Sequence, residues 1–121
     1  MTPERRLLQI RLQEHLDNAR EALFAAQQLT THTIAAGSVE AHALAYRMLC
    51  FGEALKQYTE VVETTTRAFR DPIRLRDRLA HKPLADLKIN IIVTAVALAQ
   101  KEILPEIESR RELLADALRR I

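Results

Sequence analysis

The sequence predicts an all-α protein, an antiparallel bundle of four to five helices within a single domain over residues 1–121. Apolar residues recur at helical spacing along most of the chain, which is the first observation in favour of this fold. The chain has only 2 glycines and 4 prolines, too few for the many turns of a β-sandwich or barrel. Its 48% apolar and 28% charged residues are ordinary globular values, so disorder is not expected.

The first two helices are predicted over about residues 3–31 and 39–63. In the first, Thr2 is the expected N-cap and Pro3 the first helical residue. Ser38, which follows the break at Gly37, is the expected N-cap of the second. Both segments carry apolar stripes with steps of three and four residues: Leu8, Leu12, Leu16, Ala19, Leu23 and Ala26, then Leu44, Met48, Phe51, Leu55, Tyr58 and Val62.

A short third helix is predicted over about residues 72–81. Asp71 followed by Pro72 is typical of an N-cap acid and a first-turn proline, so we expect the helix to begin there. Pro83 is expected to stop it just after His81.

A long last helix is predicted from near Asp86 to about Arg120. Between Leu87 and Leu104 it is apolar on nearly all sides, so we expect this part to lie in the middle of the bundle. Pro105 is expected to kink the helix, because a proline ring in mid-helix removes one backbone hydrogen bond.

Composition narrows the function classes. The formal charge of +2 is compatible with a polyanionic partner. A single cysteine excludes a disulfide framework, and the scattered histidines lack metal-ligand spacing, so neither a metal nor a cofactor is expected. The longest apolar stretch, Ile91–Ala99, is far shorter than the about 20 residues of a membrane span. With no signal peptide pattern at the N-terminus, the expected location is the cytoplasm, without membrane contact.

The segment 67–82 is the most basic part of the chain. The ordinary interpretation of such a segment is a solvated helix face. Within it, however, the run Arg76-Asp77-Arg78-Leu79-Ala80-His81 places one histidine among arginines. Its charged residues are Arg67, Arg70, Arg74, Arg76, Arg78 and Lys82 against Asp71 and Asp77.

The spacing within this run limits which side chains can meet. Asp77 and His81 are four residues apart, so they share a helix face, and a hydrogen bond between them would orient the imidazole. Arg76 and His81 are five apart, or about 140° around an α-helix. These two converge only if the helix end distorts or if two copies of the motif meet across a dimer.

Arginine and histidine without metal ligands suit cleavage of an RNA backbone. The ribose 2′-OH attacks its own phosphorus, histidine moves protons near neutral pH, and arginine neutralises charge that grows on the phosphate oxygens. We expect Arg70, Arg74, Arg78 and Lys82 to contact RNA mainly through charge. Phe69 is the one aromatic residue expected to be exposed for base stacking.

The motif resembles the Arg-x-x-x-x-His signature of the HEPN superfamily. In the second predicted helix, residues 45–54 (AYRMLCFGEA) are similar to a family stretch that begins A-x-R-x-L and ends G-E-A. Residues 103–107 (ILPEI) are similar to its "LP" interruption. The likeness covers about residues 5–118, and the branch that the chain most resembles is HepT, the toxin of a bacterial toxin–antitoxin pair.

This resemblance implies a metal-independent endoribonuclease that acts as a homodimer, with two motif-bearing helices lining one cleft. Arg76 and His81 would be its catalytic pair and Asp77 the polar partner that orients His81. It also implies an antitoxin, a minimal nucleotidyltransferase of the MntA type, which in some members attaches AMP to a tyrosine two residues after the histidine. Position 83 is proline here, so inhibition by occlusion and absence of inhibition both stay open.

Two other interpretations compete with the nuclease. One is a non-catalytic HEPN binding subunit that partners a minimal nucleotidyltransferase. The other is a helical dimerisation or adaptor protein without chemistry. The dipeptide Gly52-Glu53 is expected to be structural in each case, because a mid-helix glycine costs about 1 kcal/mol relative to alanine and indicates a close helix contact.

Overall fold

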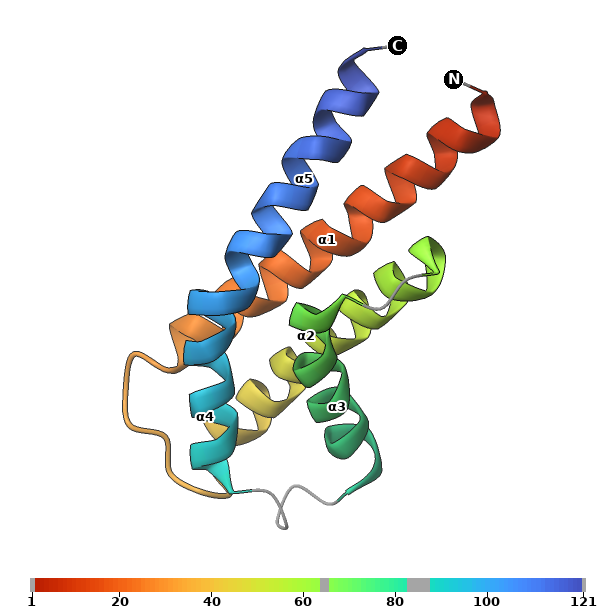
Figure 1. Cartoon of the computed structure of the whole chain (residues 1–121). Coiled ribbons are helices and arrows are strands. Elements are labelled where there is room, and N and C mark those ends of the chain that lie inside the picture. Colours follow the sequence, from red (N-terminus) through yellow and green to blue (C-terminus); the bar gives the residue numbers. More distant parts are fainter. Residues whose placement is uncertain (1, 64–65, 83–87, 121) are drawn as a thin grey trace.

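The computed structural model describes residues 2–63, 66–82 and 88–120, and these are helical apart from short connections, with no strand among them. The elements in chain order are α1 (Pro3–Leu29), α2 (Val39–Val62), α3 (Arg67–His81), α4 (Ile89–Leu98), the π-helical turn η2 (Ala99–Ile103) and α5 (Leu104–Arg119). α1, α2, α3 and α4 alternate in direction and α5 continues upward from α4, so the predicted all-α bundle with antiparallel neighbours is confirmed (Figure 1).

The starts of α1 and α2 follow from their caps. The Thr2 hydroxyl accepts a hydrogen bond from the Arg5 N–H at 3.2 Å, and the Ser38 hydroxyl accepts one from the Ala41 N–H at 3.1 Å. Each bond satisfies a first-turn N–H that has no partner within the helix. α2 ends at Glu63, whose φ of 57° is left-handed. The predicted bounds of both helices are therefore confirmed to within two residues.

The predicted start of α3 was wrong. The helix begins at Arg67 rather than at Pro72, which lies inside it. The reason is the side chain of Phe69, which is completely buried and meets the Tyr58 ring edge-on with 5.9 Å between centroids. This packing holds the first turn in place, although Pro72 cannot donate the backbone bond that a helix interior expects. Pro83, the predicted stop, lies outside the described residues.

The segment expected at the centre of the bundle lies at its edge instead. On one side α4 contacts α1 and α2, where Ile92 and Val96 are buried. On its other side Ile91 and Leu98 are 42% and 48% exposed. The prediction of a central helix was wrong because the described helices cover only one side of this apolar segment. Asp86, the predicted start, lies outside the described residues, and the described helix begins at Ile89.

The expected interruption near Pro105 is present as a π-helical turn. At this turn the Leu104 N–H donates to the carbonyl of Ala99, five residues back. A proline has no N–H to donate and its ring crowds the preceding turn, so a wider turn accommodates it. α5 then leaves in a different direction from α4 (Figure 1).

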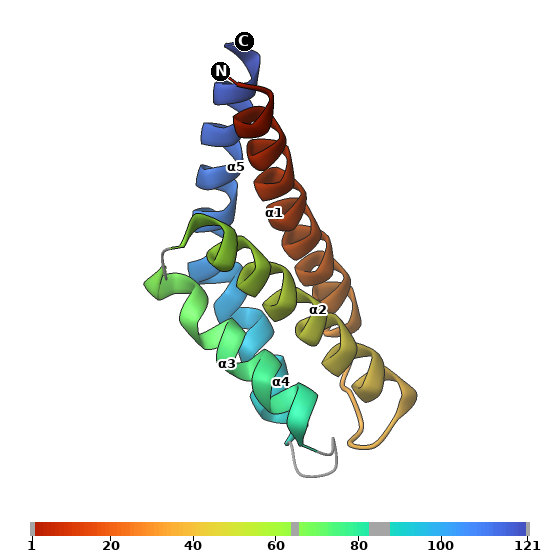
Figure 2. The same ribbon diagram turned by 90° about the vertical axis from the view of Figure 1, so that its right-hand side faces the viewer.

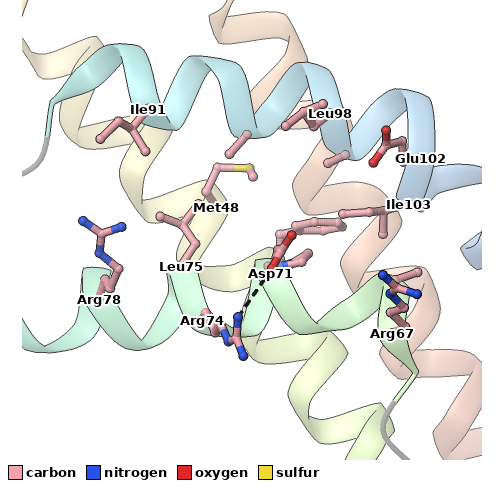
Figure 3. A pocket seen from close by; sticks show the side chains of 15 residues that line it. Met48, Arg67, Asp71, Arg74, Leu75, Arg78, Ile91, Leu98, Glu102 and Ile103 are labelled. Atoms are coloured by element: carbon pink, nitrogen blue, oxygen red, sulfur yellow. Dashed lines mark ion pairs between the residues drawn. The ribbon is translucent and has the colours of Figure 1, made fainter.

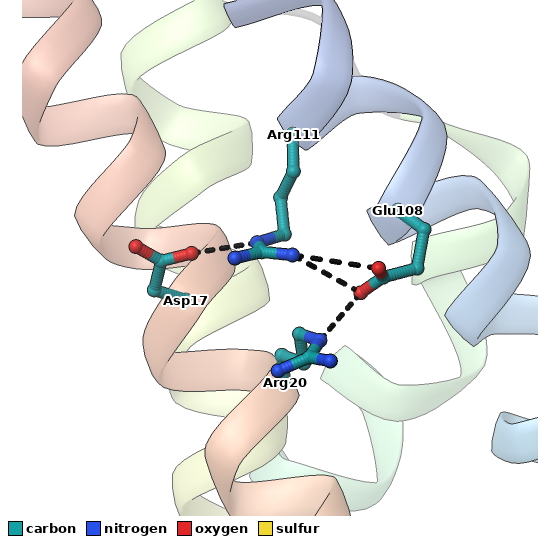
Figure 4. Close-up of polar contacts among 4 residues, drawn as sticks. All are labelled: Asp17, Arg20, Glu108 and Arg111. Atoms are coloured by element: carbon teal, nitrogen blue, oxygen red, sulfur yellow. Dashed lines mark hydrogen bonds and ion pairs between the residues drawn. The ribbon is translucent and has the colours of Figure 1, made fainter. Parts of the chain in front are cut away.

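Four charged side chains join α5 to α1 (Figure 4). Arg111 Nε lies 2.6 Å from Asp17 Oδ1, and Arg20 Nε lies 2.6 Å from Glu108 Oε1. The hydrogen bond that Arg111 donates to Asp17 raises the pKa of Arg111. All four side chains are partly exposed, and such pairs contribute about 0–1 kcal/mol each. Their main effect is to set the position of α5 along α1. Toward the two chain ends, both helices extend past the end of α2 (Figure 2).

α2 and α3 approach each other most closely at Gly52. A Cβ built on this glycine would lie 2.4 Å from the Cβ of Arg76 and 2.5 Å from the carbonyl oxygen of Pro72. Real Cβ atoms do not come this close to backbone, so only glycine fits here. The expected close helix contact at Gly52 is thus confirmed, and it sets the position of α3 on α2.

Replacing Gly52 by alanine is expected to destabilise the protein by about 1–3 kcal/mol, because the added methyl group would push α3 away from α2. At an uncrowded helical site the same change would stabilise by about 1 kcal/mol, so the sign of the effect is diagnostic. Chemical denaturation measures it. Glu60→Ala, on the exposed face of α2, is the matched control and should stay within about 0.5 kcal/mol of wild type. A stabilised Gly52→Ala variant would contradict the close contact.

Candidate functional site

Arg76 is held between two carboxylates where α3 meets α2. Its Nε donates to Glu53 Oε2 at 2.6 Å, and its Nη1 donates to Asp77 Oδ1 at 2.9 Å. Both hydrogen bonds raise the pKa of Arg76, and the bond to Asp77 has the larger effect. The side chain is 21% exposed, so the guanidinium is fixed in place and still reaches the surface.

The neighbouring Gly52 explains why this contact forms. Because Gly52 has no side chain, the backbone of α3 lies directly against α2, and the Arg76 guanidinium reaches the next residue, Glu53. The structural role expected for Glu53 is thus a bond to Arg76, a partner that the sequence pattern does not indicate. The signal available in the sequence was the glycine itself, which indicates a close contact without naming the partner.

The ion pairs leave part of the Arg76 guanidinium available. A guanidinium has five N–H donors in a planar fork. Among the residues that the structure describes, Glu53 engages one and Asp77 engages one, which leaves three. Arginine in such a fixed orientation is well suited to bind two oxygens of a phosphate group.

His81 lies at the other side of α3. It is exposed and is the last residue of the helix. Because α3 is a regular helix, His81 and Arg76 lie about 140° apart around its axis and about 7.5 Å apart along it. Within the described part of the chain, Asp77 is hydrogen-bonded to Arg76 and not to His81. Within one copy of the chain, Asp77 is therefore bonded to Arg76, and the imidazole of His81 is hydrogen-bonded to neither of them.

The exposed side of α3 carries a stripe that ends in His81. Arg70, Arg74, Asp77 and His81 follow one another at steps of four, three and four residues, and all four are exposed. Residues at these steps share one face of a helix. Lys82, directly after the helix, is exposed too. This outer stripe, defined by residues 70, 74, 77 and 81, presents two arginines and a histidine to solvent.

A groove runs along the adjacent side of α3. It has a volume of about 760 Å³ and separates α3 from α4 and η2 (Figure 3). Of the residues expected to bind RNA, Arg74 and Arg78 line this groove, whereas Arg70 and Lys82 do not. The Arg76, Asp77 and His81 side chains lie outside it as well. The structure thus divides the predicted site residues among three sides of one helix.

The exposed aromatic residue is Tyr46 rather than Phe69. The prediction for Phe69 was wrong, because its ring is buried against Tyr58. The Tyr46 side chain is 61% exposed, and a hydrogen bond to Cys50 raises its pKa. It lies in the N-terminal part of α2, at the end of the bundle where α3 ends (Figures 1 and 2). Its position off the apolar stripe of α2 could have identified it from the sequence.

Neither a metal cluster nor a membrane helix is found in the described ranges. No three His, Cys, Asp or Glu side chains there gather closely enough to hold an ion. No described helix has both the length and the apolar character needed to cross a bilayer.

Comparison with known proteins does not assign the chain to a family. No protein-family model, no curated protein and no solved structure matches it. Its functional interpretation depends on the contacts of α2 and α3.

Proposed function

We propose that the protein is a metal-independent endoribonuclease of the HEPN type, with an active site that forms between the α3 helices of a homodimer. One observation carries the proposal: Arg76 is fixed by Glu53 and Asp77, and three of its N–H donors have no partner in the described parts of the chain. The exposed stripe that ends in His81 supports it, because it adds a proton-transfer group to the same helix.

The proposed reaction is transesterification within the RNA backbone. The 2′-oxygen bonds to the adjacent phosphorus, the bond from phosphorus to the 5′-oxygen breaks, and the products are a 2′,3′-cyclic phosphate and a 5′-hydroxyl. His81 accepts the 2′-OH proton or donates one to the leaving oxygen. Arg76 binds the non-bridging oxygens, whose negative charge increases in the transition state. The exposed Arg70, Arg74, Arg78 and Lys82 hold the flanking phosphates.

A second copy of the chain is part of this proposal. Arg76 and His81 of one helix point in different directions, so one copy cannot apply both to the same phosphate. Two α3 helices that pack across a two-fold axis set the His81 of one copy against the Arg76 of the other. Asp77 then acts as a positioning residue for Arg76, to which it is bonded at 2.9 Å.

The resemblance of the motif to HepT extends the proposal to a biological role. The chain would act on cytoplasmic RNA as the toxin of a two-gene module. Its antitoxin would be a minimal nucleotidyltransferase. Because position 83 is proline, an antitoxin that acts here does so by covering the site rather than by modifying that residue.

A non-catalytic binding subunit is the second candidate, and the pairing of Arg76 favours it. Two carboxylates already balance the charge of this arginine, so its contacts with Glu53 and Asp77 are sufficient for a purely structural link between α3 and α2. In that case the chain would bind a nucleotidyltransferase and help to hold its substrate.

The proposed nuclease predicts that His81→Ala lowers RNA cleavage at least about 100-fold, because general acid–base groups contribute that much or more. Cleavage of an end-labelled RNA in EDTA measures the rate, and the product ends should be 2′,3′-cyclic phosphate and 5′-hydroxyl. His32→Ala is the matched control, since His32 is exposed in the connection between α1 and α2, and it should cleave like wild type. Equal cleavage by the His81→Ala protein would remove His81 from the mechanism. Tight nucleotidyltransferase binding without any cleavage would favour the second candidate.

A site shared between copies predicts complementation in mixed dimers. Arg76→Lys and His81→Ala chains with different tags are co-expressed, and dimers that contain one of each are purified through both tags. Each variant alone should be inactive, whereas the mixed dimer keeps one intact site of two and should recover about half of the wild-type rate. Mixed dimers as inactive as the single variants would contradict a site built from two chains. Thermal unfolding of the Arg76→Lys protein checks that its fold is intact.

A further inference from the structure

The groove beside α3 has one apolar wall, which α4 provides. Ile91, Ala95 and Leu98 follow one another at steps of four and three residues and therefore form one stripe. Ile91 and Leu98 are 42% and 48% exposed. These side chains leave a strip of apolar surface on α4 open to solvent beside the charged residues of α3. The apolar character of α4 on nearly all sides predicts that this helix is buried. The described helices, however, cover only the side of α4 opposite this stripe.

The opposite wall is charged and is formed by α3. Arg67, Asp71, Arg74 and Arg78 repeat the same steps of four, three and four residues. The two stripes run in opposite directions, so Arg78 lies near Ile91 and Arg67 lies near Glu102 (Figure 3). Asp71 pairs with Arg74 at 4.0 Å, whereas Arg78 makes no ion pair within the described residues. This wall has an excess of positive charge.

The size of the groove matches a helix. Met48 and Phe51 of α2 lie between the walls, so α2, α3 and α4 surround the groove on three sides. The charged stripe advances 11 residues from Arg67 to Arg78, or about 16 Å at 1.5 Å per residue, which is three helical turns. The apolar stripe advances 7 residues from Ile91 to Leu98, or about two turns. Three helices around a shared apolar space are the arrangement that a fourth helix completes in a four-helix bundle.

We propose that this groove binds an amphipathic helix of a partner protein, with an apolar face on α4 and an acidic flank on α3. Apolar residues at steps of three and four in the partner pack on Ile91, Ala95 and Leu98. Glutamate or aspartate on the flank pairs with Arg74 and Arg78. Glu102 lies beside Arg67 at the far end, so the acidic residues of the partner lie at the end where Arg78 faces Ile91.

The chemistry of the groove favours a protein helix over an RNA strand. Phosphates would lose hydration against the apolar wall of α4 without gaining hydrogen bonds from it. That wall also has no aromatic residue on which bases could stack. A docked helix would occupy Arg74 and Arg78 and so compete with RNA for them. The competition with RNA rests on the proposed nuclease function, whereas the docking of a partner helix does not depend on it.

Two synthetic helical peptides of 15 residues test the docking. They share one leucine face, and their flank carries glutamate in one peptide and lysine in the other. Fluorescence anisotropy with the full chain should show binding of the glutamate peptide at least tenfold tighter than that of the lysine peptide. Leu98→Glu should weaken binding of the glutamate peptide at least tenfold. Leu113→Glu, at a leucine 67% exposed on α5 outside the groove, is the matched control and should leave it unchanged.

Several results would overturn the docking proposal. Equal affinity for both peptides would remove the charge argument, and an equal effect of Leu98→Glu and Leu113→Glu would remove the groove. If Leu98→Glu turned a dimer into a monomer in light scattering, the groove would be a contact between copies of this chain. Leu98→Glu should leave RNA cleavage unchanged, so failure of peptide binding is distinguishable from failure of the proposed nuclease.

Discussion

The contact between α2 and α3 at Gly52 is the constraint on which the site depends. Because this glycine has no side chain, the backbone of α3 at Pro72 lies directly against α2. At this separation Arg76 Nε reaches Glu53 at 2.6 Å. The contact also fixes the rotation of α3 about its own axis, and thereby decides which of its charged residues face α2, solvent or the groove.

The rotation of α3 gives one helix of 15 residues three different surfaces. Arg76 faces α2, the stripe that ends in His81 faces solvent, and Arg78 faces α4. The first surface holds a fixed guanidinium, the second presents a proton-transfer group, and the third forms a wall for a partner. Both proposals follow from this division, and they are connected through Arg74, which belongs to the outer stripe and to the groove.

The sequence predicted the fold where local signals decide it. Caps at Thr2 and Ser38 act within one turn, so the starts of α1 and α2 were predictable. The start of α3 was not, because burial of Phe69 against Tyr58 of the preceding helix outweighs the local signal of Asp71-Pro72. Spacing singled out Arg76 and His81 as candidates. Spacing could not show that Asp77 binds Arg76, because it also allows Asp77 to pair with His81, four residues further along the helix.

A crystal structure of the protein with a short RNA that carries a 2′-deoxy sugar at the cleavage position would test the central claim most directly. Without the attacking hydroxyl the RNA stays intact in the site. We predict a phosphate bound to the remaining Arg76 N–H groups of one copy and close to the imidazole of His81 of the second, with the bond from Arg76 to Glu53 preserved. An RNA bound away from α3, or an Arg76 that contacts only Glu53 and Asp77 in the complex, would contradict the account.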